Sequence, residues 1–189
     1  MKQPYYHSKE GVSEYIQLAK DVDGKRLIHE LKSHLESGSS LLELGSGPGK
    51  DWEILKDDYL VTGSDNSPEF IKHLESKFPG GQFHLLDAVS LEIDEQFDCI
   101  YSNKVLHHLT DEELQKSISK QAEILTPSGI VSHSFWAGQG DEIFKGMYVN
   151  YHTIEELEKS FKTHFEIIQI TPYTEFEKND SLHLIARLK

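Results

Sequence analysis

Two kinds of apolar pattern alternate along this chain of 189 residues. Short continuous apolar runs predict strands that are buried on both faces, whereas apolar residues spaced three or four positions apart predict amphipathic helices. The predicted strands cover residues 41–44, 60–64, 82–86, 97–102 and 130–135. The predicted helices among them cover residues 51–55, 68–78 and 111–125. Repeated units of strand and helix predict a parallel sheet with right-handed crossovers and helices on both faces.

Helix-capping residues mark where two of the helices begin, one of them before the first predicted strand. Asp23 is expected to be the N-cap of a helix whose apolar stripe runs over residues 27–35. Ser67 is expected to cap the helix at residues 68–78, because Pro68 follows it at the position where a helix tolerates proline best.

The C-terminal part of the chain departs from this alternation. A helix at residues 153–161 leads into two strand-like runs, at residues 164–171 and 181–188. Their connection is shorter than the dozen or more residues that a parallel crossover needs, so these strands must be antiparallel. The sequence therefore predicts an α/β fold: a doubly wound, mostly parallel seven-stranded sheet with an antiparallel C-terminal strand.

The length suits one domain that spans residues 1–189, and no linker or internal repeat interrupts it. Residues 1–23 precede the alternating units and are expected to form an N-terminal cap. Residues 136–152 follow the fifth strand and contain glycines that could act as a hinge, so they are expected to form a lid.

Charge and hydropathy limit the classes of partner that the protein is expected to bind. Asp and Glu total 32 against 19 Lys and Arg, which gives a net charge of −13 and disfavours nucleic acid or an anionic membrane as a partner. No apolar run of 18 residues and no signal-peptide pattern occurs, so a cytoplasmic protein is expected, as a monomer or a homodimer. Cys99 is the only cysteine, and an intrachain disulfide is therefore excluded.

A glycine-rich segment follows the first predicted strand. Residues 43–49 read Glu-Leu-Gly-Ser-Gly-Pro-Gly, and glycine lets backbone N–H groups approach a ligand closely. Asp65, Asp87 and Asn103 each end a later strand. The carboxyl ends of parallel strands meet at one edge of the sheet, where ligands bind at the topological switch point. The sequence therefore predicts a small-molecule site at this edge.

The glycine segment resembles the first motif of the class I S-adenosylmethionine (SAM)-dependent methyltransferases, and the resemblance covers nearly all of residues 24–189. It implies a Rossmann-like sheet, SAM as the cofactor and S-adenosylhomocysteine (SAH) as its product. Asp65 would bind the ribose hydroxyls, Asn66 would lie along the adenine, Asp87 and Ala88 would contact the adenine ring, and the backbone near Asn103 would hold the methionine part. The glycine motif would supply the remaining cofactor contacts, from Glu43, Gly45, Ser46, Gly47 and Gly49.

A histidine pair is the candidate for catalysis. The segment 106–111 is similar to one in plant small-molecule O-methyltransferases whose first histidine is a general base, which makes His107 the candidate base and His108 a weaker one. The alternative is that both imidazoles only pack and cap the loop. The family's Asn-Pro-Pro-aromatic signature is absent, which argues against DNA bases and glutamine side chains as acceptors and favours a small molecule with an oxygen or nitrogen nucleophile.

Aromatic residues flank the predicted site and are expected to wall the acceptor pocket, unless they are ordinary core: Tyr5, Tyr6, Tyr15, His133, Trp136, Tyr148 and Tyr151. No metal is expected, because no histidine pair has metal-ligand spacing on a helix with an acid. Two other functions stay open. One is a module that binds SAM or SAH without turnover. The other is a nicotinamide-dependent oxidoreductase, against which the Gly-x-Gly-x-Gly spacing speaks.

Overall fold

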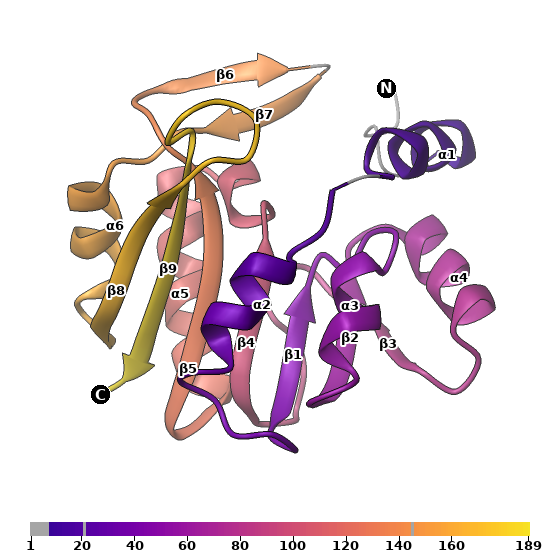
Figure 1. Cartoon of the computed structure of the whole chain (residues 1–189), viewed down its shortest axis with the longest axis horizontal. Coiled ribbons are helices and arrows are strands. Elements are labelled where there is room, and N and C mark those ends of the chain that lie inside the picture. Colours follow the sequence, from indigo (N-terminus) through magenta and orange to yellow (C-terminus); the bar gives the residue numbers. More distant parts are fainter. Residues whose placement is uncertain (1–7, 21, 145) are drawn as a thin grey trace.

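A seven-stranded sheet forms the centre of the computed structural model, which describes residues 8–20, 22–144 and 146–189 (Figure 1). The strand order is β3-β2-β1-β4-β5-β9-β8. The strands are β1 (Ser40–Leu44), β2 (Leu60–Asp65), β3 (Gln82–Leu85), β4 (Phe97–Asn103), β5 (Leu125–Trp136), β8 (Phe165–Tyr173) and β9 (Ser181–Leu188). Strand β9 pairs antiparallel with β5 and with β8, whereas the other neighbours pair parallel. The predicted fold class is confirmed.

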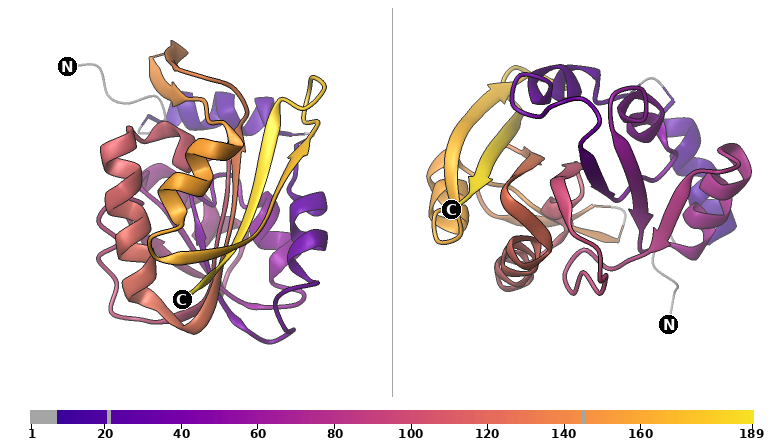
Figure 2. Two further views of the ribbon diagram at one scale, coloured as in Figure 1. Left: turned by 90° about the vertical axis from the view of Figure 1, so that its left-hand side faces the viewer. Right: turned by 90° about the horizontal axis from the view of Figure 1, so that it is seen from below.

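Helices cover both faces of this sheet (Figure 2). Helices α2 (Lys25–Leu31) and α3 (Lys50–Leu55) pack on one face, and α5 (Asp111–Ile124) and α6 (Ile154–Phe161) pack on the other. Helix α4 (Pro68–Lys77) lies beside α3, where the rings of Trp52 and Phe78 are 4.7 Å apart. Between β3 and β4 the chain crosses over through residues 86–96 without a helix.

Strand β1 is buried on both of its faces, as its apolar run predicted. Leu41 joins the apolar cluster under α2 and α3, which also holds Cys99. Leu42 and Leu44 join the larger cluster under α5 and α6. Both clusters lie at the middle of the sheet, so the strand ends that carry the predicted site rest on a packed core.

Capping explains where most of the helices begin. Ser67 Oγ accepts a hydrogen bond from the Phe70 amide with Pro68 in the first turn, which confirms the predicted start of α4. The predicted cap of α2 is wrong: Gly24 is the N-cap, and Asp23 Oδ1 accepts from the Lys25 amide without closing a helical turn. Helix α2 is also shorter than its apolar stripe, because turns replace the helix after Leu31.

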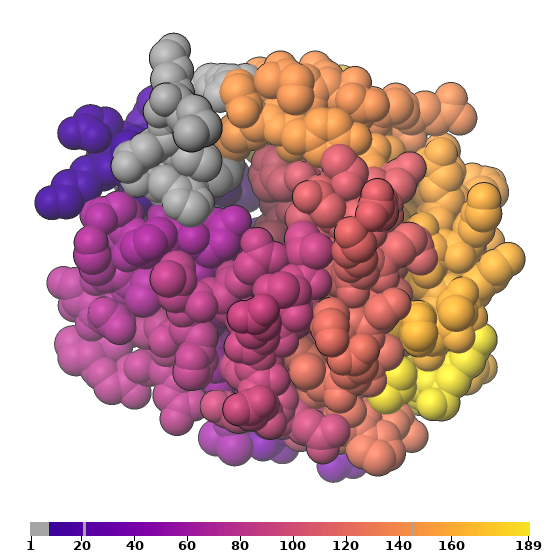
Figure 3. Space-filling view, turned by 180° about the vertical axis from the view of Figure 1, so that it is seen from behind, coloured from indigo at the N-terminus to yellow at the C-terminus, as the bar shows by residue number. Residues whose placement is uncertain are grey.

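Two segments lie over the carboxyl ends of the strands. Helix α1 (Lys9–Leu18) precedes α2, and strands β6 (Asp141–Phe144) and β7 (Met147–Asn150) form a separate antiparallel hairpin (Figures 1 and 2). From behind, this β6–β7 hairpin forms the upper end of the molecule above α5 (Figure 3). The segment 136–152, expected as a glycine-hinged lid, thus contains a two-stranded hairpin.

No helix in the described ranges is long and apolar enough to cross a membrane.

Candidate functional site

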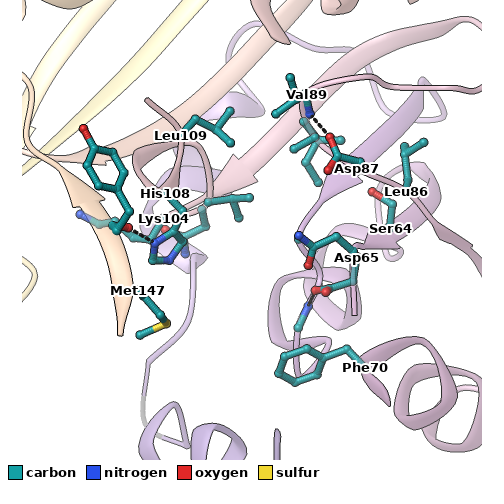
Figure 4. A pocket seen from close by; sticks show the side chains of 18 of the residues that line it. Ser64, Asp65, Phe70, Leu86, Asp87, Val89, Lys104, His108, Leu109 and Met147 are labelled. Carbon is teal, nitrogen blue, oxygen red and sulfur yellow. Dashed lines mark hydrogen bonds between the residues drawn. The ribbon is translucent and has the colours of Figure 1, made fainter. Parts of the chain in front are cut away.

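Two cavities, each of about 280 Å³, lie side by side at the carboxyl ends of β1, β2 and β4. The first is bounded by the glycine loop, the end of β2, the loop after β3 and the β6–β7 hairpin (Figure 4). The second lies between the glycine loop, α1 and the connection from β8 to β9. Five residues line both cavities: Tyr15, Gly45, Asn103, Lys104 and Met147. The two cavities therefore meet at the end of β4.

The first cavity brings together most of the predicted cofactor residues from four separate segments of the chain: Gly45, Gly47, Asp65, Asn66, Asp87, Ala88 and Asn103. In Figure 4, Asp65 and Asp87 lie on one wall, and Lys104, His108 and Met147 lie on the facing wall. The expectation that strand ends converge on one site is thus met in the geometry.

The glycine loop is held by the carboxylate of Asp65. Asp65 Oδ2 accepts from the Gly47 amide at 3.0 Å, and Oδ1 accepts from the Ser67 amide at 2.9 Å. Gly45 has a φ of +66°, and a Cβ there would lie 2.5 Å from a methyl group of Val105. Glycine at this position therefore keeps the loop close to the residues that follow β4.

Gly49 lines neither of the two cavities, although it was assigned to the cofactor. It is the N-cap of α3 with a φ of +75°, and a Cβ there would lie 2.5 Å from the Phe78 ring and 2.7 Å from Leu74. The described contacts of Gly49 are therefore those of close packing between α3 and α4.

Asp87 forms a turn after β3 at the edge of the first cavity. Its Oδ1 accepts from the amides of Val89 at 2.7 Å and Ser90 at 3.1 Å. These bonds fix the carboxylate while the side chain stays exposed to the cavity.

The second cavity contains two buried carboxylates. Glu43 is 3% exposed and accepts from Ser46 Oγ at 2.7 Å. Asp51 accepts from the Gly24 amide at 2.6 Å, from the Tyr101 hydroxyl at 2.8 Å and from Asn103 Nδ2 at 3.0 Å. Burial raises the pKa of both carboxyls, and the charge of Asp51 raises the pKa of Glu43 further. A cation bound beside these carboxylates would stabilise their charged forms and so lower both pKa values.

Sequence reasoning missed Asp51 and Lys104. Asp51 lies in the first turn of the helix that follows the glycine loop, a position from which a carboxylate can reach back toward Glu43, and this was the available signal. Lys104 has a φ of +55° and directly follows β4. Its Nζ donates to the Phe135 carbonyl at 3.0 Å and to Ser181 Oγ at 2.6 Å, and lies 3.6 Å from the Trp136 ring centroid. Burial lowers the pKa of Lys104 to about 7.

The two histidines after β4 differ in placement. His108 lines the first cavity, and its Nδ1 bonds the Tyr148 carbonyl at 2.7 Å. A carbonyl can only accept, so Nδ1 carries the proton and the neutral ring has its lone pair on Nε2. His107 is buried, lines neither of the two cavities, and its Nδ1 has no partner among the described residues. Burial lowers the pKa of both imidazoles, and the neighbouring His108 lowers that of His107 further.

The aromatic residues expected around an acceptor are only partly brought together. Tyr15 lines both cavities, Tyr148 the first and Trp136 the second. The hydroxyl of Tyr151 donates to Glu142 instead, and Tyr151 lines neither cavity. Tyr5 and Tyr6 lie outside the described residues.

His133 does not face the site. It lies within β5, inside the predicted strand and not beyond the strand end. The imidazole is fully buried, with Nδ1 bonded to Ser102 Oγ and Nε2 to Gln121 Oε1, each at 2.8 Å. Its expected place in the acceptor pocket is corrected to one in the core between the sheet and α5.

In the part of the chain that the structure describes, no group of three or more His, Cys, Asp or Glu side chains could hold a metal ion. The strand order reverses between β1 and β4, and both cavities lie at this switch point. This arrangement defines the class of the protein, a Rossmann-like α/β fold with a ligand site beyond the strand ends.

Comparisons with known proteins show which proteins the chain is similar to. A model described as a methyltransferase domain matches residues 41–129. An uncharacterized methyltransferase of Anoxybacillus flavithermus is 26% identical over 162 residues, covering 75% of this chain and 76% of that protein. Phosphoethanolamine N-methyltransferase 1 of Triticum aestivum is 31% identical over 171 residues, covering 82% of this chain and 34% of that protein, so the chain spans about a third of its length.

Among solved structures, Burkholderia thailandensis 1,6-didemethyltoxoflavin-N1-methyltransferase, with bound 1,6-didemethyltoxoflavin and S-adenosylhomocysteine, superposes with a TM-score of 0.76. The identity is 19%, and the match covers 100% of this chain and 91% of that one, so the likeness is one of fold. Residues 41–129 thus match a methyltransferase domain, and the fold is that of SAM-dependent methyltransferases of known structure.

Proposed function

We propose that this protein transfers a methyl group from SAM to a small-molecule acceptor through an oxygen or nitrogen nucleophile. The observation that carries the proposal is the pair of cavities that meet at Asn103, one with polar strand-end residues and the other with two buried carboxylates. SAM supplies an electrophilic methyl group on a sulfonium, and after the transfer the cofactor leaves as SAH. Its adenosine and its amino-acid part suit the first and the second cavity respectively.

Each part of the cofactor would meet groups of matching chemistry. Asp65 would accept from the ribose hydroxyls, and Asp87 from the exocyclic amine of adenine, with Asn66 and Ala88 beside the ring. Glu43 would hold the ammonium group together with Asp51, with Ser46 bridging to the loop. The bound cation would offset the mutual repulsion of the two carboxylates.

The proton of an acceptor hydroxyl would go to His108 rather than to His107. His108 lines the first cavity and has its lone pair on Nε2, and the lowered pKa keeps the ring neutral at pH 7. His107, the sequence-based choice, instead packs behind the cavity wall, where its ring lies 4.0 Å from that of His108. Proximity and orientation between α1 and the β6–β7 hairpin would supply the rest of the catalysis.

Calorimetry of SAH binding tests the proposal. The wild type should bind SAH with a micromolar dissociation constant, about −8 kcal/mol. Asp65→Asn should weaken binding by about 2 kcal/mol, because the ribose hydroxyls lose a charged acceptor.

Asp98→Asn is the matched control. Asp98 also bonds a backbone amide, that of Ser40, but it lies at the opposite ends of the strands, so its SAH affinity should equal that of the wild type. Unchanged affinity in Asp65→Asn contradicts the site. Binding of NAD in place of SAH would favour the oxidoreductase, and SAH binding without methyl transfer across a metabolite screen would favour the non-catalytic module.

A further inference from the structure

The mouth of the second cavity carries exposed apolar side chains from three segments. Leu18 of α1 is 60% exposed, Phe144 of the β6–β7 hairpin 54% and Phe176 of the connection between β8 and β9 69%. These segments lie at the same end of the sheet (Figure 1). Large apolar side chains that gather around one opening indicate a contact surface for an apolar ligand.

The connection between β8 and β9 is held in place by Asp180. Its carboxylate accepts from the amides of Glu175 at 2.8 Å, Phe176 at 2.9 Å and Glu177 at 2.8 Å. Phe176 also stacks on Trp136, with ring centroids 6.0 Å apart and an interplanar angle of 27°. The loop therefore presents a fixed aromatic surface and the side chain of Glu175 to the second cavity.

Lys104 is the cation that acts on Glu175, but its amine forms hydrogen bonds with other residues. Lys104 Nζ donates to Phe135 and Ser181, and its remaining face lies on the Trp136 ring, so no N–H is left for an anionic ligand whether the amine carries three hydrogens or two. No salt bridge to Glu175 occurs among residues 8–20, 22–144 and 146–189. Burial raises the pKa of this half-buried carboxyl, although the charge of Lys104 acts in the opposite direction.

We infer that the methyl acceptor is an amine with an apolar body, that its nitrogen donates a hydrogen bond to Glu175 and that its body packs on Phe176 and Phe144. The inference rests on the proposed function, because Glu43 and Asp51 are then occupied by the cofactor's ammonium group. Glu175 remains as the acid of this cavity that faces the acceptor.

The reaction with such an acceptor balances without a further reactant. The alkylammonium loses one proton to solvent, and the lone pair of the neutral amine forms the new N–C bond. The C–S bond breaks with its electron pair passing to sulfur, which becomes the neutral thioether of SAH. Positive charge thus moves from sulfur to nitrogen, and Glu175 would stabilise it where it develops.

The test uses probes with one phenyl body and different polar groups. 2-Phenylethylamine, 2-phenylethanol and phenylacetate are titrated by calorimetry into the intact protein saturated with SAH. The amine should bind at least tenfold more tightly than the other two, because only it gains a charge-assisted hydrogen bond. In Glu175→Gln this preference should be lost, with SAH affinity unchanged.

Glu177→Gln is the matched control, since it removes the same charge from an exposed side chain of the same loop that lines neither of the two cavities, and it should keep the preference. The inference is overturned if the amine does not bind, if phenylacetate or the alcohol binds as tightly, or if Glu175→Gln keeps the preference. Failure of SAH itself to bind the wild type would instead contradict the proposed function. Thermal melts of both variants establish that they are folded.

Discussion

Left-handed glycines in the loop after β1 serve different purposes. Gly45 and Gly47 line the first cavity, and the absence of a Cβ at Gly45 leaves room for the side chain of Val105. Gly49 has the same kind of backbone but lies against the rings and methyl groups of α4. This glycine motif therefore combines residues that line a cavity with a residue that packs against a neighbouring helix.

Gly49→Ala should destabilise the protein by about 2–4 kcal/mol, which combines the cost of a left-handed alanine with that of a Cβ forced against Phe78. Gly80→Ala is the control: its φ is +91°, but a Cβ there meets no atom within 4 Å, so only the backbone cost of about 1 kcal/mol remains. Urea unfolding measures both. Equal losses in the two variants would show that packing of α3 on α4 is not the reason for glycine at position 49.

At the scale of elements, the β6–β7 hairpin connects the two cavities. Tyr148 lines the first, Phe144 the second and Met147 both. Its strand β7 is attached to the rest of the protein, because the Tyr148 carbonyl bonds His108 and Asn150 Nδ2 donates to Asp111. All four residues of its outer strand β6 are exposed. A hairpin that is attached along one strand and exposed along the other can adjust its position over a ligand at low cost.

Amide hydrogen exchange should therefore slow in residues 141–148 when SAH and 2-phenylethylamine are added, by roughly tenfold as the hairpin closes. Strand β9 is buried in the sheet and serves as the internal control, with the same exchange rate in both states. The closing motion is refuted if the hairpin exchanges equally fast with and without ligands at saturating concentrations.

The sequence predicted the elements that a strong local signal defines. Apolar runs identified the sheet, and Ser67 with Pro68 placed α4 within a residue. Strand β5 was predicted too short, because Thr126 to Gly129 carry turn residues, whereas Leu125 before them still pairs with Phe97 of β4 across a register shift. His133 lies inside the predicted strand, and its hydrogen bonds to Ser102 and Gln121, which no local pattern shows, hold it in the core.

The site was predictable where chemistry is tied to strand ends, and unpredictable where it depends on tertiary packing. Asp65 and Asp87 follow strands and reached the cavity. Which of His107 and His108 faces the ligand depends on a single 3₁₀ turn, Leu106–His108, and no periodicity in the sequence decides its rotation. The amine of Lys104 is held by a hydrogen bond to Ser181, a residue 77 positions away, and no local pattern predicts such a contact.

For the whole molecule, buried histidines make stability depend on pH. Burial lowers the pKa of His133 to about 3, and it also lowers the pKa of His107 and His183. The unfolded chain binds protons at these imidazoles near pH 6.5, whereas the folded protein does not. Stability is therefore unaffected by them above pH 6.5 and falls as the pH drops below it.

Between pH 6.5 and 5.5, His133 alone should cost about 1 kcal/mol of unfolding free energy. The carboxyls of Glu43 and Asp51, with raised pKa values, act in the opposite direction, so the contribution is isolated by comparison with His133→Gln, whose stability should change less steeply with pH. His29→Gln, which removes an exposed imidazole, should leave the slope of the wild type unchanged. An identical slope in His133→Gln means that the imidazole is protonated in the folded protein.

Cys99, the one thiol of the chain, lies in the middle of β4 with no exposed surface, and burial raises its pKa far above the usual range. Maleimide reagents attack the thiolate, which this residue neither forms nor exposes while the protein is folded. A cysteine introduced at Ile143, on the exposed outer strand of the hairpin, would therefore take a fluorophore or a spin label selectively. Cys99 does not need to be replaced first, so the wild-type sequence can serve as the background for single-molecule distance measurements.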